Sequence, residues 1–189
     1  MPRIVLVHPE IPPNTGNVAR SCAATGTPLH LVEPLGFEIS DRQLRRAGLD
    51  YWPLVDLHRH GDLAAFEGHC RRQGGRRVAL SARAEHGIWD FAFRDDDWLL
   101  FGRESDGLPE AVTAGADACL TIPMPLGSGR GSTGAGVRSL NLSVAVAVVL
   151  FEALRQLRSP GAIGILAAGP PPDAGGGGGA TARGGVPHP

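Results

Sequence analysis

Three polar blocks in this sequence contain the side chains that could carry chemistry. The first is Glu10-Ile11-Pro12-Pro13-Asn14-Thr15-Gly16-Asn17-Val18-Ala19-Arg20, and the second begins with Phe101-Gly102-Arg103-Glu104. The third comprises Ile122-Pro123-Met124 and, after a glycine-rich break, Ser139-Leu140-Asn141-Leu142-Ser143. Each block follows an apolar run that reads as a strand, and α/β proteins bind ligands in the loops that follow strands. Each block is therefore a candidate ligand-binding loop.

In the first block, a helix is expected to begin at Asn14 or Thr15, which can cap it, and to end near Thr25 before Gly26. Asn17 and Arg20 are three residues apart and would share one face of this helix. The backbone N–H groups at a helix N-terminus favour an anion such as phosphate. The alternative is purely structural, with Asn14 as a cap and Arg20 as a surface residue.

The second block begins where a strand over residues 98–101 emerges into Gly102. Glycine lets the backbone approach a ligand closely, and Gly107 and Pro109 would shape the following loop and the start of the next helix. A plain strand–turn–helix junction is the alternative.

In the third block, Ile122 offers backbone groups and apolar surface, and Ser139 and Asn141 offer hydrogen bonds. The alternative is an N-cap, in which Ser139 caps the last helix and Asn141 is only a polar residue of its first turn. Residues 125–138 also match a dinucleotide fingerprint, Gly129-x-Gly131-x-x-Gly134. That match has little weight because a true fingerprint follows the first strand of its fold.

Strand-like and helix-like segments alternate along the chain, which predicts a mostly parallel α/β sheet flanked by helices. Strands are expected over residues 4–7, 29–32, 54–57, 78–80, 98–101 and 118–122. Helices are expected over residues 15–25, 41–47, 62–73 and 140–157. His58 and His60 are expected on a loop or an edge strand rather than in a metal site, and Asp95-Asp96-Asp97 in a solvated turn.

The composition of the 189 residues predicts one domain over residues 1–158 and a Gly/Pro-rich tail over 159–189, disordered from Gly169 onward. Apolar runs are too short for a membrane span, and no signal peptide is evident. Three cysteines without metal spacing predict buried free thiols, and we expect a cytoplasmic protein. The net charge of −1 is unusual for a nucleic-acid binder, so any RNA contact must use local arginine clusters, which could equally be solvated helix faces. These clusters are Arg42, Arg45 and Arg46, and Arg71, Arg72, Arg76 and Arg77.

Together, the three blocks resemble the motifs of the SPOUT class of RNA methyltransferases, in its SpoU branch of ribose 2′-O-methyltransferases. The resemblance covers residues 1 to about 158 and is closest to the subgroup that modifies the tRNA wobble nucleotide, with Arg45-Arg46-Ala47-Gly48-Leu49-Asp50-Tyr51 as a further match. It implies a deep C-terminal trefoil knot and methyl transfer from S-adenosylmethionine to a ribose 2′-hydroxyl without a metal.

The resemblance also implies roles for particular residues. Arg20, Asn17 and Glu104 would be catalytic, and Asn14, Arg45 and Arg46 would contact RNA. The cofactor would be held by Leu80, Gly102, Ile122, Ser139 and Asn141. A guanidinium does not lose its proton at ordinary pH, so Arg20 would hold phosphate or stabilise a developing alkoxide rather than act as a base.

The expected partners are the anticodon stem-loop of tRNA and a second copy of the chain, paired through the last helix. Two alternatives stay open: a 2′-O-methyltransferase acting on ribosomal RNA or another tRNA position, and a non-catalytic RNA-binding knotted protein. Methyl transfer would exclude the second, and a longer N-terminal RNA-binding domain would favour the first.

Overall fold

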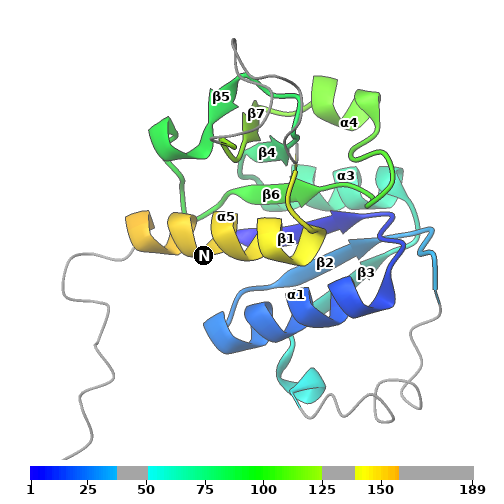
Figure 1. The fold of residues 1–189 in the computed structure, drawn as a ribbon. Coiled ribbons are helices and arrows are strands. Elements are labelled where there is room, and N and C mark those ends of the chain that lie inside the picture. Colours follow the sequence, from blue (N-terminus) through cyan, green and yellow to red (C-terminus); the bar gives the residue numbers. More distant parts are fainter. Residues whose placement is uncertain (38–50, 125–138, 158–189) are drawn as a thin grey trace, which may run out of the picture. The chain divides into compact units, whose positions relative to one another are not determined.

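Parallel strands make up the central sheet, in the order β3-β2-β1-β6-β4-β7-β5 (Figure 1). A computed structural model describes residues 1–37, 51–124 and 139–157 of the chain. Within these ranges the sheet has seven strands: β1 (Arg3–Val7), β2 (Leu29–Val32), β3 (Leu57–His60), β4 (Arg77–Leu80), β5 (His86–Gly87), β6 (Trp98–Phe101) and β7 (Ala118–Thr121). Every pairing between these strands is parallel, which confirms the predicted, mostly parallel α/β sheet with flanking helices.

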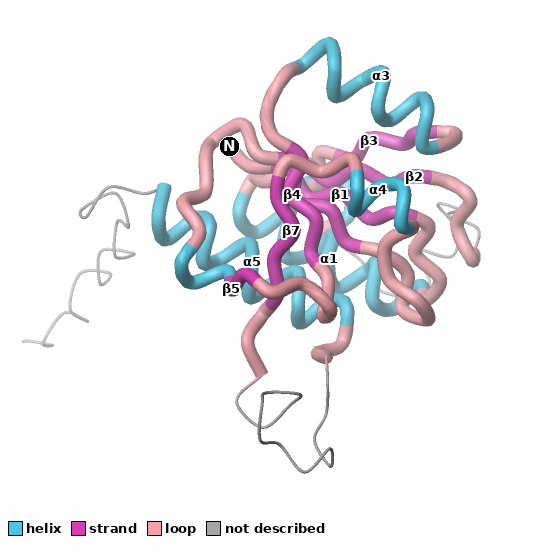
Figure 2. The backbone as a smooth tube through the Cα atoms, turned by 90° about the horizontal axis from the view of Figure 1, so that it is seen from above, coloured by secondary structure: helices cyan, strands magenta, loops and turns pink. Residues whose placement is uncertain are grey.

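Helices cover both faces of the sheet. Helices α1 (Pro12–Thr25) and α5 (Leu142–Leu157) pack on one face, and α3 (Leu63–Gln73) and α4 (Glu110–Ala114) on the other. In Figure 2 the strands lie between α3 on one side and α5 on the other. A hydrophobic core lies on each face. Along β1, Ile4 and Leu6 point into the core under α1 and α5, and Val5 and Val7 point into the core under α3 and α4. Burial on both sides explains why residues 4–7 of this strand are continuously apolar rather than alternating.

The helix ends differ partly from the expectation. Gly26 ends α1 in the left-handed region, at φ 68°, as predicted. Asn14 and Thr15 do not cap α1, because the helix begins at Pro12 and Ile11 is its N-cap, without a side-chain bond. At α5, Asn141 rather than Ser139 caps the helix: its Oδ1 accepts the Ser143 N–H at 2.9 Å.

The strand expected over residues 54–57 is wrong, because the segment 52–54 forms a 3₁₀ helix, η1 (Trp52–Leu54). Strand β3 follows it. Its sequence, Leu-His-Arg-His, is mostly polar and lacks the apolar run by which the other strands were predicted. It is an edge strand, as expected for His58 and His60. Strand β5 and the 3₁₀ helix η2 (Ile88–Asp90) were not predicted, because each is too short to give a periodic pattern.

Asp97 also departs from the expected solvated turn. It is fully buried, and its carboxylate pairs with the Arg76 guanidinium at 2.8 Å. Arg76 therefore serves the fold and is not part of an exposed basic face. The neighbouring Asp95 and Asp96 are exposed, as expected.

The remaining expectations concern thiols and segments outside the described ranges. Cys22 and Cys70 are buried free thiols, and Cys119 is a half-buried one. No helix among the described residues is long and apolar enough to cross a membrane. The expected helix over 41–47, the glycine-rich segment 125–138 and the tail lie outside the described residues. The described residues belong to one compact unit, Met1–Leu157, while the domain boundary at 158 and the knot stay predictions.

Candidate active site

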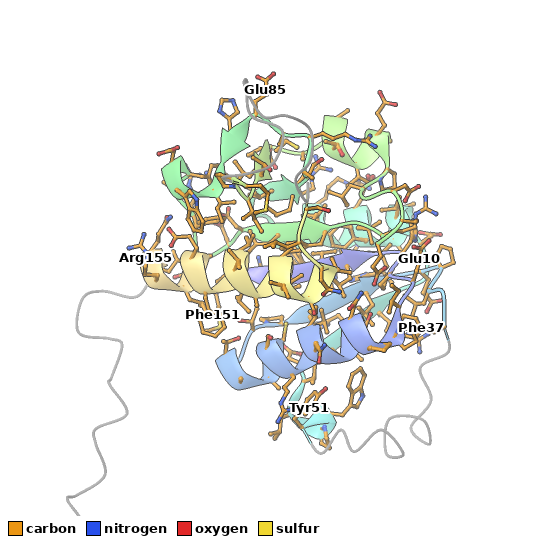
Figure 3. All side chains as sticks on the ribbon, viewed as in Figure 1. Glu10, Phe37, Tyr51, Glu85, Phe151 and Arg155 are labelled. Carbon is orange, nitrogen blue, oxygen red and sulfur yellow. The ribbon has the colours of Figure 1, made fainter. Side chains whose placement is uncertain are left out.

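The first two blocks meet because β1 and β6 are neighbouring parallel strands, so the loops at their carboxyl ends lie side by side. The Glu104 carboxylate accepts the backbone N–H of Glu10 at 2.9 Å and that of Ile11 at 3.3 Å. In return, the Glu10 carboxylate accepts the Ser105 hydroxyl at 3.0 Å and the Ser105 N–H at 3.2 Å. Figure 3 shows Glu10 at the end of the sheet where α1 begins. Each loop therefore accepts hydrogen bonds from the other through one carboxylate.

Asn14 extends this contact to the third block. Its Nδ2 donates to Glu104 Oε1 at 3.0 Å, and its Oδ1 accepts from Asn141 Nδ2 at 3.0 Å. A carboxylate can only accept, so the amide nitrogen of Asn14 must face Glu104 and its oxygen must face Asn141. Asn14 is 6% exposed. We call Asn141, Asn14 and Glu104 the polar relay; it joins all three blocks through one buried amide.

The N-terminus of α1 does not offer free N–H groups for phosphate, contrary to the expectation. Pro12 and Pro13 occupy its first two positions and have no N–H to donate. The next two N–H groups, of Asn14 and Thr15, donate to the Ile11 carbonyl at 3.0 and 3.3 Å. The anion found beside this terminus is the Glu104 carboxylate. At this terminus, only side chains of α1 remain available to bind an anion.

The structure shows a reason within the chain itself for a glycine at position 102. A Cβ built on it would lie 2.0 Å from the Gly107 carbonyl carbon and 2.1 Å from the Leu108 nitrogen. The loop returns this closely because Arg103 and Gly107 exchange two backbone hydrogen bonds, at 3.0 and 3.1 Å. Gly107 is at φ 82°, which favours glycine. The close approach is thus made by the chain itself, and it shapes the loop that carries Glu104.

Three of the predicted cofactor residues, Leu80, Gly102 and Ile122, lie at the carboxyl ends of β4, β6 and β7, which are neighbouring strands. Leu80 ends β4 opposite Leu120 of β7, while Gly102 directly follows β6 and Ile122 directly follows β7. Leu80 and Ile122 are half-buried and pack against the core. Asn141 reaches the same end of the sheet through the polar relay. Ser139 is exposed just before α5.

Arg20 and Asn17 lie on the exposed face of α1, while Val18, Ala19 and Cys22 face the core. They share a face, as predicted, but among the described residues neither side chain bonds to the polar relay. The Arg20 guanidinium carbon instead lies 5.4 Å from the centre of the Tyr51 ring. Arg45 and Arg46 lie outside the described residues.

Some residues at this end of the sheet were not found by sequence reasoning. Glu10 and Ser105 join the two loops, yet a single loop glutamate or serine gives no local signal in a sequence. His8 directly follows β1 with φ 54°, uncommon for a residue other than glycine. Its Nδ1 is buried without a hydrogen-bond partner among the described residues. Strained, unpaired groups of this kind cluster at functional sites.

A second polar cluster lies between β2, β3 and α3. The Nδ1 of His30 and the Nε2 of His60 are 2.9 Å apart, and the His58, His69 and Trp98 rings surround His30. Burial, followed by the charges of its neighbours, lowers the pKa of His30 to about 3. Burial also lowers the pKa of His60 and of His69. These residues do not form a group that could hold a metal ion, nor do any others among the described ranges.

Comparison with known proteins agrees with this arrangement. A Synechocystis relative, provisionally named tRNA (cytidine(34)-2′-O)-methyltransferase, is 53% identical over 161 residues, which is 85% of this chain and all of the relative. A solved structure concerned with 2-OH methylation of C/U34 on tRNA is 54% identical, with a TM-score of 0.73 over 83% of this chain and 96% of its own. An AdoMet-bound rRNA methyltransferase from Sinorhizobium meliloti is 26% identical, with a TM-score of 0.68 over 84% of this chain and 57% of its own. The model of the SpoU rRNA Methylase family matches residues 1–151, and the chain therefore belongs to that family.

Proposed function

We propose that this chain methylates the ribose 2′-hydroxyl of the wobble nucleotide, position 34, of tRNA, with S-adenosylmethionine as the methyl donor. The observation that carries the proposal is the polar relay, which brings the three motif blocks to one end of the sheet. The substrate assignment is supported by the relative and the structure that share about half of its residues and concern C34 or C/U34.

The residues proposed to hold the cofactor fit an adenosine group. Leu80 and Ile122 supply half-buried apolar surface, while Gly102 and the strand ends supply backbone donors and acceptors. Asn141 donates one of its two amide hydrogens to Asn14, and Ser139, two residues earlier in the chain, is exposed. A protein bound to AdoMet shares the fold at 26% identity, which supports this assignment. S-adenosylmethionine, when bound, supplies the electrophilic methyl group.

The chain's own task is to hold the ribose and to stabilise charge on its 2′-oxygen. Arg20 is exposed and can donate a pair of N–H groups to a phosphate or to a developing alkoxide. Asn17, on the same exposed face, adds an amide that can orient the sugar. Glu104 is proposed to act indirectly, because its carboxylate already accepts three hydrogen bonds from the first block. Asn14 is buried, so a direct RNA contact through its amide would require the polar relay to open.

A homodimer through α5 is part of the proposal. Val144 and Phe151 are seven residues apart, on one face of α5, and are 48% and 57% exposed. Exposed apolar side chains on a helix favour burial against a partner. The second copy, with Arg45 and Arg46, would help to hold the anticodon stem-loop. We also propose the trefoil knot, a domain ending near residue 158 with an accessory tail, and action in the cytoplasm, where tRNA is modified.

The test is methyl transfer from labelled S-adenosylmethionine into unmodified bulk tRNA and, separately, into ribosomal RNA, followed by nucleoside analysis. Label in 2′-O-methylcytidine or a 2′-O-methyluridine derivative from tRNA supports the proposal. Label only in ribosomal RNA would favour the alternative function, 2′-O-methylation of ribosomal RNA. The family description and the Sinorhizobium meliloti structure suggest that alternative. RNA binding without any methyl transfer would favour the other alternative, a non-catalytic RNA-binding protein.

A further inference from the structure

Tyr51 lies next to α1 (Figure 3). It contacts that helix at two points one turn apart, at Gly16 and at Arg20. Its hydroxyl donates to the Gly16 carbonyl at 2.7 Å, and the Arg20 guanidinium carbon lies 5.4 Å from the ring centre. Gly16 and Arg20 are four residues apart, which is about one helical turn. The hydroxyl therefore binds one turn of the helix, at Gly16, and the ring contacts Arg20 on the next turn.

The backbone around Tyr51 is itself fixed. Tyr51 is the N-cap of η1, and its carbonyl accepts the Leu54 N–H at 2.9 Å. Both Tyr51 and Trp52 are half-buried and pack against the core on the α1 face of the sheet. The chain then enters β3, which pairs with β2. The phenol thus approaches α1 from a segment that the sheet holds in place.

An aromatic partner suits an arginine that must bind an anion. Among the described residues, no carboxylate lies within ion-pair distance of Arg20, whereas Arg76 is paired with Asp97. A carboxylate would neutralise the guanidinium and occupy the N–H groups that a phosphate needs. An aromatic face attracts the cation within about 6 Å and leaves those N–H groups available. It also reduces the rotamer freedom that substrate binding would otherwise remove.

We propose that Tyr51 is a positioning residue for Arg20, which it holds toward the ribose and phosphate of the substrate in the methyl-transfer reaction. This proposal rests on the function proposed above. Sequence reasoning placed Tyr51 only within a segment that resembles the wobble-specific subgroup and gave it no role. The arrangement assigns one: the ring orients the guanidinium, and the hydroxyl fixes the ring.

The kinetic test compares two substitutions at Tyr51 with a control on the same segment. Tyr51→Leu removes the ring and should lower kcat for tRNA methylation by roughly 10- to 100-fold, since small misplacements of a catalytic group cost this much. Tyr51→Phe keeps the ring and should restore most of that loss. S-adenosylmethionine affinity, measured by calorimetry, should be unchanged in both. Leu54→Ala, at a side chain that is 73% exposed, should leave kcat unchanged.

A double-substitution cycle tests whether Tyr51 acts through Arg20. In an Arg20→Lys background, which keeps the charge but lacks the planar guanidinium, Tyr51→Leu should reduce the residual kcat much less than it does in the native chain. An equal reduction in both backgrounds would overturn the proposal. So would a Tyr51→Leu variant with native kcat, or one that loses cofactor affinity in the same proportion, since a merely structural role predicts that loss.

A third readout does not depend on activity. Tyr51 is the single tyrosine of the chain, so incorporated 3-fluorotyrosine gives one ¹⁹F resonance that reports on its ring. Arg20→Ala should shift this resonance, and Leu54→Ala should shift it much less. An unchanged resonance in Arg20→Ala would show that the two side chains do not meet in solution. If the shift occurs but the native chain fails to methylate tRNA, the contact stands and the proposed function fails instead.

Discussion

Asn14 and Glu104 are 90 residues apart in the chain, yet the amide nitrogen of the first lies 3.0 Å from the carboxylate of the second. The remaining oxygen of that amide accepts from Asn141, so one buried side chain joins the two loops and the start of α5. A group with both its donor and its acceptor engaged is rigid and tolerates few replacements. The polar relay thus explains how three distant blocks hold one geometry.

Asn14→Asp should be strongly destabilising, although the two side chains have nearly the same shape. The substitution removes the N–H groups that serve Glu104 and places a second carboxylate beside it. We expect a loss of about 2–3 kcal/mol in the free energy of unfolding, the size of a lost hydrogen bond to a charged group. Urea denaturation measures this loss. Asn17→Asp, on the exposed face of the same helix, is the control and should cost far less. Equal stability of the two variants would argue against the relay.

Glu104→Gln should lower methyl transfer more than it lowers stability. The amide keeps one carbonyl oxygen, so it cannot accept all three N–H groups that the carboxylate accepts. The loop would lose its fixed position against the first block, and kcat should fall by roughly 100-fold if it is misplaced by about 1 Å. The matched control is Glu110→Gln on α4, where the side chain is exposed. Native turnover in Glu104→Gln would show that these bonds do not position the site.

Gly102→Ala should be among the most damaging small substitutions in this chain. The added methyl would lie 2.0 Å from backbone atoms that cannot rotate away. Steric overpacking typically costs about 1–3 kcal/mol, and a backbone neighbour places this case at or above the upper end. Thermal or urea unfolding gives the value. Gly61→Ala is the control, because nothing lies within 4 Å of its added Cβ. A mild Gly102→Ala variant would mean that the loop after β6 opens readily.

Stability should fall as the solution becomes acidic, because of the histidines between β2, β3 and α3. The pKa of His30 is lowered to about 3 from an unfolded value near 6.5, so the unfolded chain binds more protons between these values. The free energy of unfolding is therefore highest above pH 6.5 and decreases as the pH falls through this window. His30 alone accounts for roughly 2 kcal/mol at pH 5, at about 1.36 kcal/mol per pH unit.

The groups that face His30 shape this pH dependence. They come from β1, β3 and α3: Arg3, His58, His60 and His69. The Asp56 carboxylate lies beside this group, 3.0 Å from the Nε2 of His58. Urea denaturation at pH 7.5 and pH 5.0 measures the difference. His86→Ala, at an exposed histidine of β5, should leave that difference unchanged. A native chain equally stable at both pH values would show that His30 accepts a proton without cost.

Arg20→Ala should abolish turnover and leave S-adenosylmethionine binding intact. The side chain lies on the exposed face of α1, separate from the strand ends that are proposed to hold the cofactor. Calorimetric titration of the cofactor and methyl transfer to tRNA give the two quantities. A large loss of cofactor affinity in this variant would contradict its assignment to the RNA side.

Local sequence patterns were sufficient for most elements of the fold. Apolar runs such as Ile4–Val7 identified buried parallel strands, and the spacing of Val146, Val149 and Ala153 identified α5. Sequence patterns did not predict β3, because its histidines pack against other histidine rings rather than in an apolar core.

The site was predictable only in part. The motif blocks named Glu104, Asn14 and Asn141, but not that these three side chains bond to one another, because that requires β1 and β6 to be neighbours. Strand order is not readable from the sequence. For the same reason, Glu10, Ser105 and Tyr51 gained roles only from the tertiary structure.

The most direct test of the central claim uses two versions of one tRNA that differ by a single atom. One carries cytidine at position 34, and the other carries 2′-deoxycytidine there, which removes the proposed methyl acceptor. Both are incubated with the chain and labelled S-adenosylmethionine. We expect transfer to the first tRNA and none to the second. Equal transfer to both would contradict the proposed function, since the methyl group would then be going to another atom.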